Sequence, residues 1–157
     1  MITGDADKSA WKDHITENYK SDLPSEVLSA CHHGSRTFFK DSEDDKDVYE
    51  THIEEIKPEY IIISAPKQKD SPHGHPHNDA MDLYKKHVDD EDNILHLGSG
   101  PYSVIVDIEE DGTLSVTTDK ELIETYGNDD DDGKKNENAS RAYVGTRTTR
   151  IDNQPMG

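Results

Sequence analysis

The sequence predicts an α/β domain in which strands and helices alternate along the chain. Short apolar runs that are typical of strands, at residues 27–31, 60–64 and 94–97, are separated by segments with the spacing of amphipathic helices. Only 30% of the 157 residues are hydrophobic and 33% are charged, which favours a thin sheet core with polar loops over a helical bundle. Alternation of this kind is typical of layered α/β proteins.

The chain opens with a short apolar stretch at residues 1–3, which ends in a Gly-Asp turn. A helix is expected over residues 10–19, with Asp7 or Ser9 as its N-cap. Apolar side chains four residues apart predict that this helix has one apolar face, formed by Trp11, Ile15 and Tyr19. The strand at residues 27–31 follows it.

The middle of the chain repeats this order. A helix is expected over residues 48–56 and ends before Pro58. The continuous β-branched run at 60–64 then predicts a strand that is buried on both faces. A further helix is expected over residues 78–87, with Asn78 as its N-cap.

The last ordered element is expected to be a β-hairpin. An Asp-Gly pair at 111–112 lies between strand patterns at 102–108 and 113–117, and this pair is a strong hairpin signal. Beyond it, residues 128–157 are polar and acidic, so we expect them to be disordered. The predicted organisation is therefore one domain over residues 1–127 and a tail over 128–157.

Composition and charge narrow the classes of function. The net charge is −18, with 35 acidic residues against 17 basic ones, and such a surface repels phosphate backbones. General nucleic-acid binding is therefore not expected, although a local metal site can still act on a phosphate. The single cysteine, Cys31, excludes an intrachain disulfide. No apolar run approaches the roughly 20 residues that a membrane-spanning helix needs, and the N-terminus has no signal-peptide pattern. We expect a cytoplasmic protein that does not enter the membrane.

Polar residues gather where the predicted strands end. Because the carboxyl ends of strands in open α/β sheets bind ligands, these residues are candidates for a functional site. Carboxylate and imidazole together suit zinc, manganese or iron. Taken singly, each motif also fits a surface turn or a solvated histidine cluster. The candidates are Asp5, His32, His33, Ser64, His73, His75 and His77.

Four motifs in this order resemble one protein family. They are Ile-Thr-Gly-Asp at 2–5, His-His-Gly-Ser-Arg-Thr at 32–37, Lys-Pro-Glu-Tyr-Ile-Ile-Ile-Ser at 57–64 and Gly-His-Pro-His at 74–77. The series resembles the C-terminal half of metallo-β-lactamase-fold hydrolases of the ComEC-like, DNA-uptake-related type, over roughly residues 1–118. The resemblance implies the second half of an αββα sandwich, with a mixed sheet and flanking helices. It also implies a metal-dependent hydrolase of phosphodiesters or other esters.

The resemblance implies metal ligands in this chain. Asp5 matches the family's Gly-Asp aspartate, which bridges two metal ions. His32 matches a histidine ligand of one of these ions, and His33 remains its close rival. The expected metal is zinc, with manganese as the second choice.

The same resemblance implies residues that face the substrate, which is a small molecule or a phosphodiester. His75 and His77 of Gly-His-Pro-His border the family's cleft and are expected to act as catalytic residues, in substrate contact or proton transfer. Ser35 and Arg36 follow the ligand and are expected to bind substrate, as is Ser64 at the end of the predicted strand at residues 60–64.

One part of the family's pattern is absent. The other metal ligands of the family come from an earlier His-x-His-x-Asp-His signature, and this chain starts after the point where it should occur. His75-Pro-His-Asn-Asp-Ala80 imitates it, but lacks the last histidine and falls after the Gly-Asp motif. We therefore expect that a separate chain supplies the missing N-terminal half. The alternative is a non-catalytic remnant, or an interaction or regulatory protein that retains the half-fold.

Overall fold

The computed structural model describes residues 1–100 and 103–119. The chain divides into two compact units, residues 1–104 and residues 105–157, and each is described by itself. The candidate site residues all belong to the first unit. The expected tail at 128–157 and the expected domain boundary at 127 lie outside the described residues.

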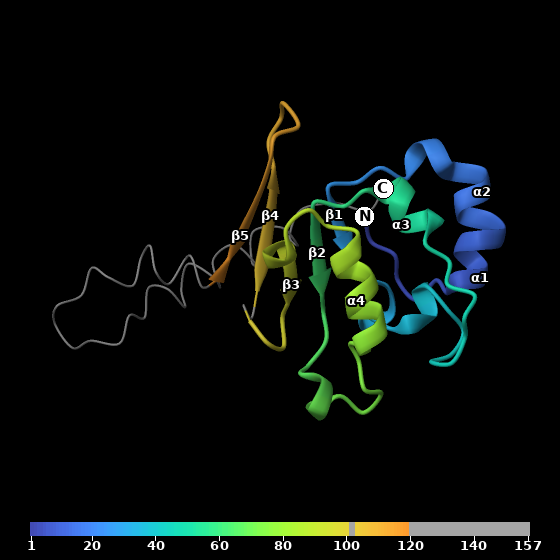
Figure 1. The fold of residues 1–157 in the computed structure, drawn as a ribbon. Coiled ribbons are helices and arrows are strands. Elements are labelled where there is room, and N and C mark those ends of the chain that lie inside the picture. The colour runs from blue at the N-terminus through green and yellow to red at the C-terminus, as the bar shows by residue number, and fades with distance from the viewer. Residues whose placement is uncertain (101–102, 120–157) are drawn as a thin grey trace, which may run out of the picture. The chain divides into compact units, whose positions relative to one another are not determined.

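The first unit is built on a parallel sheet. Its strands are β1 (Val27–Ser29), β2 (Tyr60–Ile63) and β3 (Ile94–His96), hydrogen-bonded in the order β1-β2-β3 (Figure 1). An isolated parallel bridge between Ile2 and Ser29 adds the N-terminal backbone beside β1. Parallel strands joined through helices confirm the α/β class.

Helices connect these strands. The segment before β1 contains α1 (Lys8–Ala10), a π-helical turn (Trp11–Ile15) and α2 (Thr16–Tyr19), while α3 (Thr51–Ile56) and α4 (Asn78–Lys86) form the later crossovers (Figure 1). Because successive crossovers step in one direction and crossovers are right-handed, the connecting helices lie on one face of the sheet. Short 3-10 turns cover Lys20–Asp22, Cys31–His33, Arg36–Phe38, Gln68–Asp70 and Glu91–Asn93.

Burial along β2 follows from this one-sided cover. Ile61 and Ile63 are fully buried in the core that the helices share, whereas Tyr60 and Ile62 on the alternate positions are only half buried. The prediction that this strand is buried on both faces was therefore wrong. The run is apolar throughout, but helices pack on only one side of it.

The first helical segment departs from the predicted face. Asp7 is its N-cap, because the Asp7 Oδ1 accepts a hydrogen bond from the Ala10 N–H at 2.9 Å. The π-helical turn then widens the spacing, so that Thr16 is buried together with Trp11. Tyr19 is 58% exposed, which makes the predicted position of this residue on the apolar face wrong.

Several helix and strand boundaries differ from the predicted ones. The second helix begins at Thr51 and not at residue 48. β1 ends at Ser29 and not at residue 31, and a 3-10 turn begins at Cys31. Asn78 is the first residue of α4, and the N-cap position belongs to His77. The prediction that Asn78 caps this helix was wrong.

The expected hairpin is formed by β4 (Val104–Ile108) and β5 (Leu114–Thr118), and all of it except Val104 belongs to the second unit. Gly112 has φ +86° and donates its N–H to the Glu109 carbonyl at 3.0 Å. Only glycine adopts such a conformation without strain. The predicted Asp-Gly turn is confirmed.

Candidate functional site

Three backbone segments meet at the carboxyl ends of the parallel strands. The His32 N–H donates to the Gly4 carbonyl at 2.9 Å, which places Asp5 one residue away from this contact. The His77 N–H donates to the Gly34 carbonyl at 3.0 Å, so the Gly-His-Pro-His loop is held against the paired histidines. The structure therefore brings together motifs that are far apart in the sequence. Asp5 itself is exposed.

The paired histidines adopt a left-handed backbone. His32 has φ 46°, His33 has φ 59° and Gly34 has φ 80°. Positive φ is uncommon in residues other than glycine, and such conformations cluster at functional sites. A Cβ at Gly34 would lie 2.7 Å from the Pro76 Cβ, so the turn also needs glycine to pack against the Gly-His-Pro-His loop. The turn directs two imidazoles to the same edge of the sheet.

Around this turn the histidines form a cluster. The ring of His75 lies 5.2 Å from that of His32, 4.7 Å from that of His77 and 5.9 Å from that of His73, measured between centroids. His75 is 7% exposed. Burial first, and then the charges of the neighbouring histidines, lower the pKa of His75 to about 4. His75 is therefore a neutral imidazole at pH 7.

Two backbone contacts fix the tautomers of the flanking histidines. The His33 Nδ1 lies 2.6 Å from the Ser64 carbonyl oxygen, which can only accept, so this nitrogen carries the hydrogen and leaves Nε2 with a free lone pair. The Arg36 backbone N–H donates to the His77 Nδ1 at 3.0 Å, so neutral His77 carries its hydrogen on Nε2. Burial and the Arg36 charge lower the pKa of His77.

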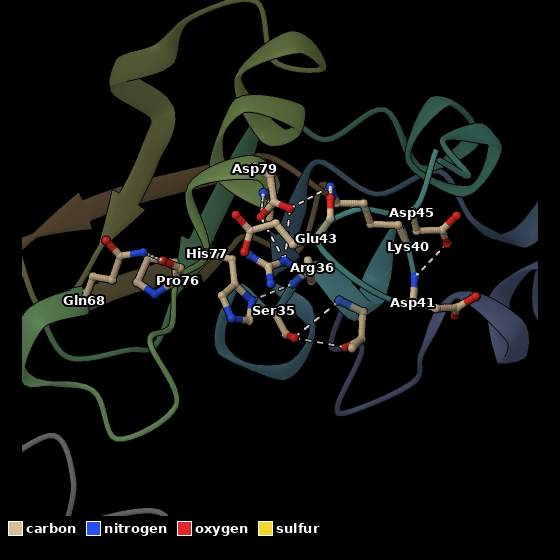
Figure 2. A network of polar contacts seen from close by, with 12 residues as sticks. Ser35, Arg36, Lys40, Asp41, Glu43, Asp45, Gln68, Pro76, His77 and Asp79 are labelled. Carbon is tan, nitrogen blue, oxygen red and sulfur yellow. Dashed lines mark hydrogen bonds and ion pairs between the residues drawn. The ribbon is translucent and has the colours of Figure 1, made fainter. Parts of the chain in front are cut away.

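A carboxylate network anchors the Arg36 loop (Figure 2). Asp79, in the first turn of α4, accepts from the Arg36 Nε at 3.0 Å and pairs with the Lys40 Nζ at 2.8 Å, while Glu43 pairs with the Arg36 Nη2 at 3.2 Å. Burial alone would raise the pKa of Asp79, but hydrogen bonds from Lys40 and Arg36 outweigh it and lower the pKa. This network holds the Arg36 backbone where its N–H meets His77.

The predicted substrate-binding residues have different surroundings. Ser35 is 2% exposed, and its hydroxyl oxygen accepts from the Thr37 N–H at 3.3 Å and from the Thr37 hydroxyl at 3.1 Å. This hydroxyl therefore stabilises the turn. The side chain of Ser64 is exposed, while its carbonyl holds His33. Contact of Ser35, Arg36 and Ser64 with substrate stays a prediction.

Sequence reasoning missed Asp79 and Lys40. Asp79 follows His77 by two residues, at the start of a helix where an acid is unremarkable. Lys40 follows Arg36 by four residues, outside any predicted helix or strand. Two cationic residues at this spacing are a weak sequence sign of a carboxylate partner.

The metal ligands implied by the resemblance are incomplete. Within residues 1–100 and 103–119, no group of three or more His, Cys, Asp or Glu side chains is arranged to hold a metal ion. A zinc site usually has three or four protein ligands. Asp5, His32 and His33 are residue types that can bind metal, and metal binding by them stays a prediction.

No family model, curated protein or solved structure matches this chain. In the part that the structure describes, no helix is long and apolar enough to cross a membrane. The function is therefore inferred from side-chain geometry and from the sequence motifs.

Proposed function

We propose that this chain is part of a metal-dependent hydrolase of the metallo-β-lactamase superfamily, acting on a phosphodiester or another ester. Its one-sided parallel sheet would be the second half of the αββα sandwich. The observation that carries the proposal is the left-handed turn at His32 and His33, hydrogen-bonded through His32 to Gly4. This turn brings a carboxylate and paired imidazoles to one sheet edge.

The metal would be zinc or manganese, held in part by Asp5 and His32. His33 is a second candidate ligand, because its Nδ1–H donates to a carbonyl, as the second ring nitrogen of metal-ligating histidines usually does. The remaining donors would come from outside the described residues. When bound, such metals lower the pKa of a coordinated water and polarise the phosphoryl group.

The protonation states of His75 and His77 suit proton transfer beside the proposed metal site. Neutral His77 presents an Nε2–H, which can donate to a substrate oxygen or to a leaving group. His75 stays neutral at pH 7 and lies between His32 and His77. The Arg36 guanidinium is already paired with Asp79 and Glu43, so its role would be to hold His77 through the backbone.

One observation favours a second function. The described residues contain no group of three ligands, which also fits a non-catalytic interaction or regulatory protein that retains the half-fold. Such a protein would use its acidic surface, with a net charge of −18. The two functions differ in whether Asp5 and His32 bind metal at all.

Calorimetric titration of the chain with Zn²⁺ and Mn²⁺ tests the proposal. We expect weak binding that Asp5→Ala and His32→Ala reduce, because these two variants each remove a proposed ligand. His73→Ala is the control, since His73 is exposed and is not a proposed ligand. His33→Ala decides between the paired histidines. Equal affinity of the unchanged chain and Asp5→Ala, with loss in His73→Ala, would assign the binding to the histidine loop and contradict the proposal.

A further inference from the structure

A surface hollow contains none of the proposed metal ligands in its lining. It is an open depression of about 410 Å³ between the loop after β2 and the loop after β3, and it is called the lysine hollow below. Both loops follow the carboxyl ends of parallel strands, where α/β sheets bind ligands. Its lining consists of Pro66, Lys67, Lys69, Asp70, Leu97 and residues 98–100.

The two loops that form the lysine hollow are packed backbone against backbone. A Cβ at Gly98 would lie 2.4 Å from the Pro66 carbonyl carbon and 2.5 Å from the Ala65 oxygen, so only glycine fits there. The His96 Nε2 lies 3.1 Å from the Ala65 oxygen and 3.0 Å from the Pro66 oxygen, and donates to these carbonyls. These contacts fix the two loops against each other, so the fold itself positions the lining of the hollow.

The lining of the lysine hollow has a net positive charge. Within residues 1–100 and 103–119, neither Lys67 nor Lys69 forms an ion pair, although the chain as a whole has a net charge of −18. Asp70 also lines the hollow and leaves it one net positive charge. Two unpaired ammonium groups beside a glycine-containing loop form a local site for an anion. Most other described basic side chains are paired with carboxylates: Lys8, Lys12, Lys20, Arg36, Lys40, Lys85 and Lys86.

We propose that the lysine hollow binds a phosphate group of the substrate, other than the group that is hydrolysed. This inference rests on the proposed function and narrows its substrate to phosphodiesters that carry a second phosphate. Lys67 follows Ser64 by three residues, and three residues span at most about 11 Å. Because the Ser64 carbonyl holds His33, a substrate with two neighbouring phosphates can reach both places.

The test is a titration of the full chain with inorganic phosphate in the presence of EDTA, followed by ¹H–¹⁵N NMR. We expect saturable shifts of the Gly98 and Ser99 amides. The double variant Lys67→Gln/Lys69→Gln should weaken binding by about tenfold, because two charge contacts are lost. The matched control is Lys46→Gln, which removes an exposed lysine that forms no ion pair within the described residues.

Two further variants make the test sharper. Asp70→Asn should tighten phosphate binding, because it removes the only carboxylate in the lining. Gly98→Ala should weaken binding without changing any charge, because the new Cβ forces the two loops apart. Unchanged affinity in the double lysine variant, or an equal loss in Lys46→Gln, would overturn the proposal.

A second probe tests the substrate class. A thymidine dinucleotide with a 5′-phosphate should bind more tightly than the same dinucleotide without it, and the double lysine variant should remove this difference. Equal binding of the two dinucleotides would overturn the inference. These titrations contain no metal. Phosphate binding can therefore fail while metal-dependent hydrolysis succeeds, or succeed while hydrolysis fails. The two proposals are thus tested separately.

Discussion

At the scale of single residues, His52 is a titratable group that lies buried among aromatic rings. Its ring is fully buried, with centroids 4.0 Å from the ring of Phe38, 5.0 Å from Tyr49 and 5.4 Å from Phe39. Burial lowers the pKa of His52 to about 3, whereas an unfolded histidine titrates near about 6.5. Between these two values only the unfolded chain takes up the proton. Stability is therefore lost as the pH falls from about 6.5 towards about 3.

This linkage predicts the result of replacing the ring. Urea denaturation between pH 7 and pH 4 should show a pH dependence of the unfolding free energy that is smaller in His52→Phe. One proton bound only on unfolding contributes about 1.4 kcal/mol per pH unit. The exposed residue His14 provides the control, His14→Phe. Identical slopes in the unchanged chain and His52→Phe would show that His52 is not the group responsible.

The same scale shows what could be predicted about the site. The placement of His32 and His33 at a strand end followed from an apolar run that stops at a Gly-Ser turn. The proton positions could not be predicted, because the contact that fixes the tautomer of His77 comes from Arg36, which is 41 residues away in the chain. A sequence contains no direct sign of such a partner.

At the scale of elements, Asp79 joins α4 to the Arg36 loop. Asp79→Asn should lower the free energy of unfolding by about 1–3 kcal/mol, because Arg36 and Lys40 lose a charged partner while they stay largely buried. Asp82→Asn is a matched control on the same helix, since Asp82 is exposed. Denaturant midpoints give the comparison. Equal shifts in the two variants would mean that the Asp79 network does not anchor the loop.

Element types were more predictable than element faces. The strand and helix order followed from apolar spacing and from breakers such as Pro58. The faces depended on tertiary packing: a π-helical turn exposes Tyr19, and one-sided helix cover leaves Ile62 half buried. Neither the π-helical turn nor the lack of a helix on the second face of β2 has a local signal in the sequence.

At the scale of the whole molecule, the proposed metal site needs more ligands than the described residues supply. Asp5 and the paired histidines lie at one sheet edge, and no group of three ligands is present in residues 1–100 and 103–119. The motif order predicted the shared edge, because parallel strands end together. Hydrolysis should therefore depend on a second polypeptide segment that supplies the remaining metal ligands.

The most direct test measures hydrolysis of bis(p-nitrophenyl) phosphate with Zn²⁺ or Mn²⁺ present. The 157-residue chain alone should be inactive. Mixed with a metallo-β-lactamase-type N-terminal half that carries His-x-His-x-Asp-His, it should gain activity that Asp5→Ala and His32→Ala abolish and the exposed control His14→Ala keeps. Strong hydrolysis by the chain alone, or restored activity that survives Asp5→Ala, would contradict the account.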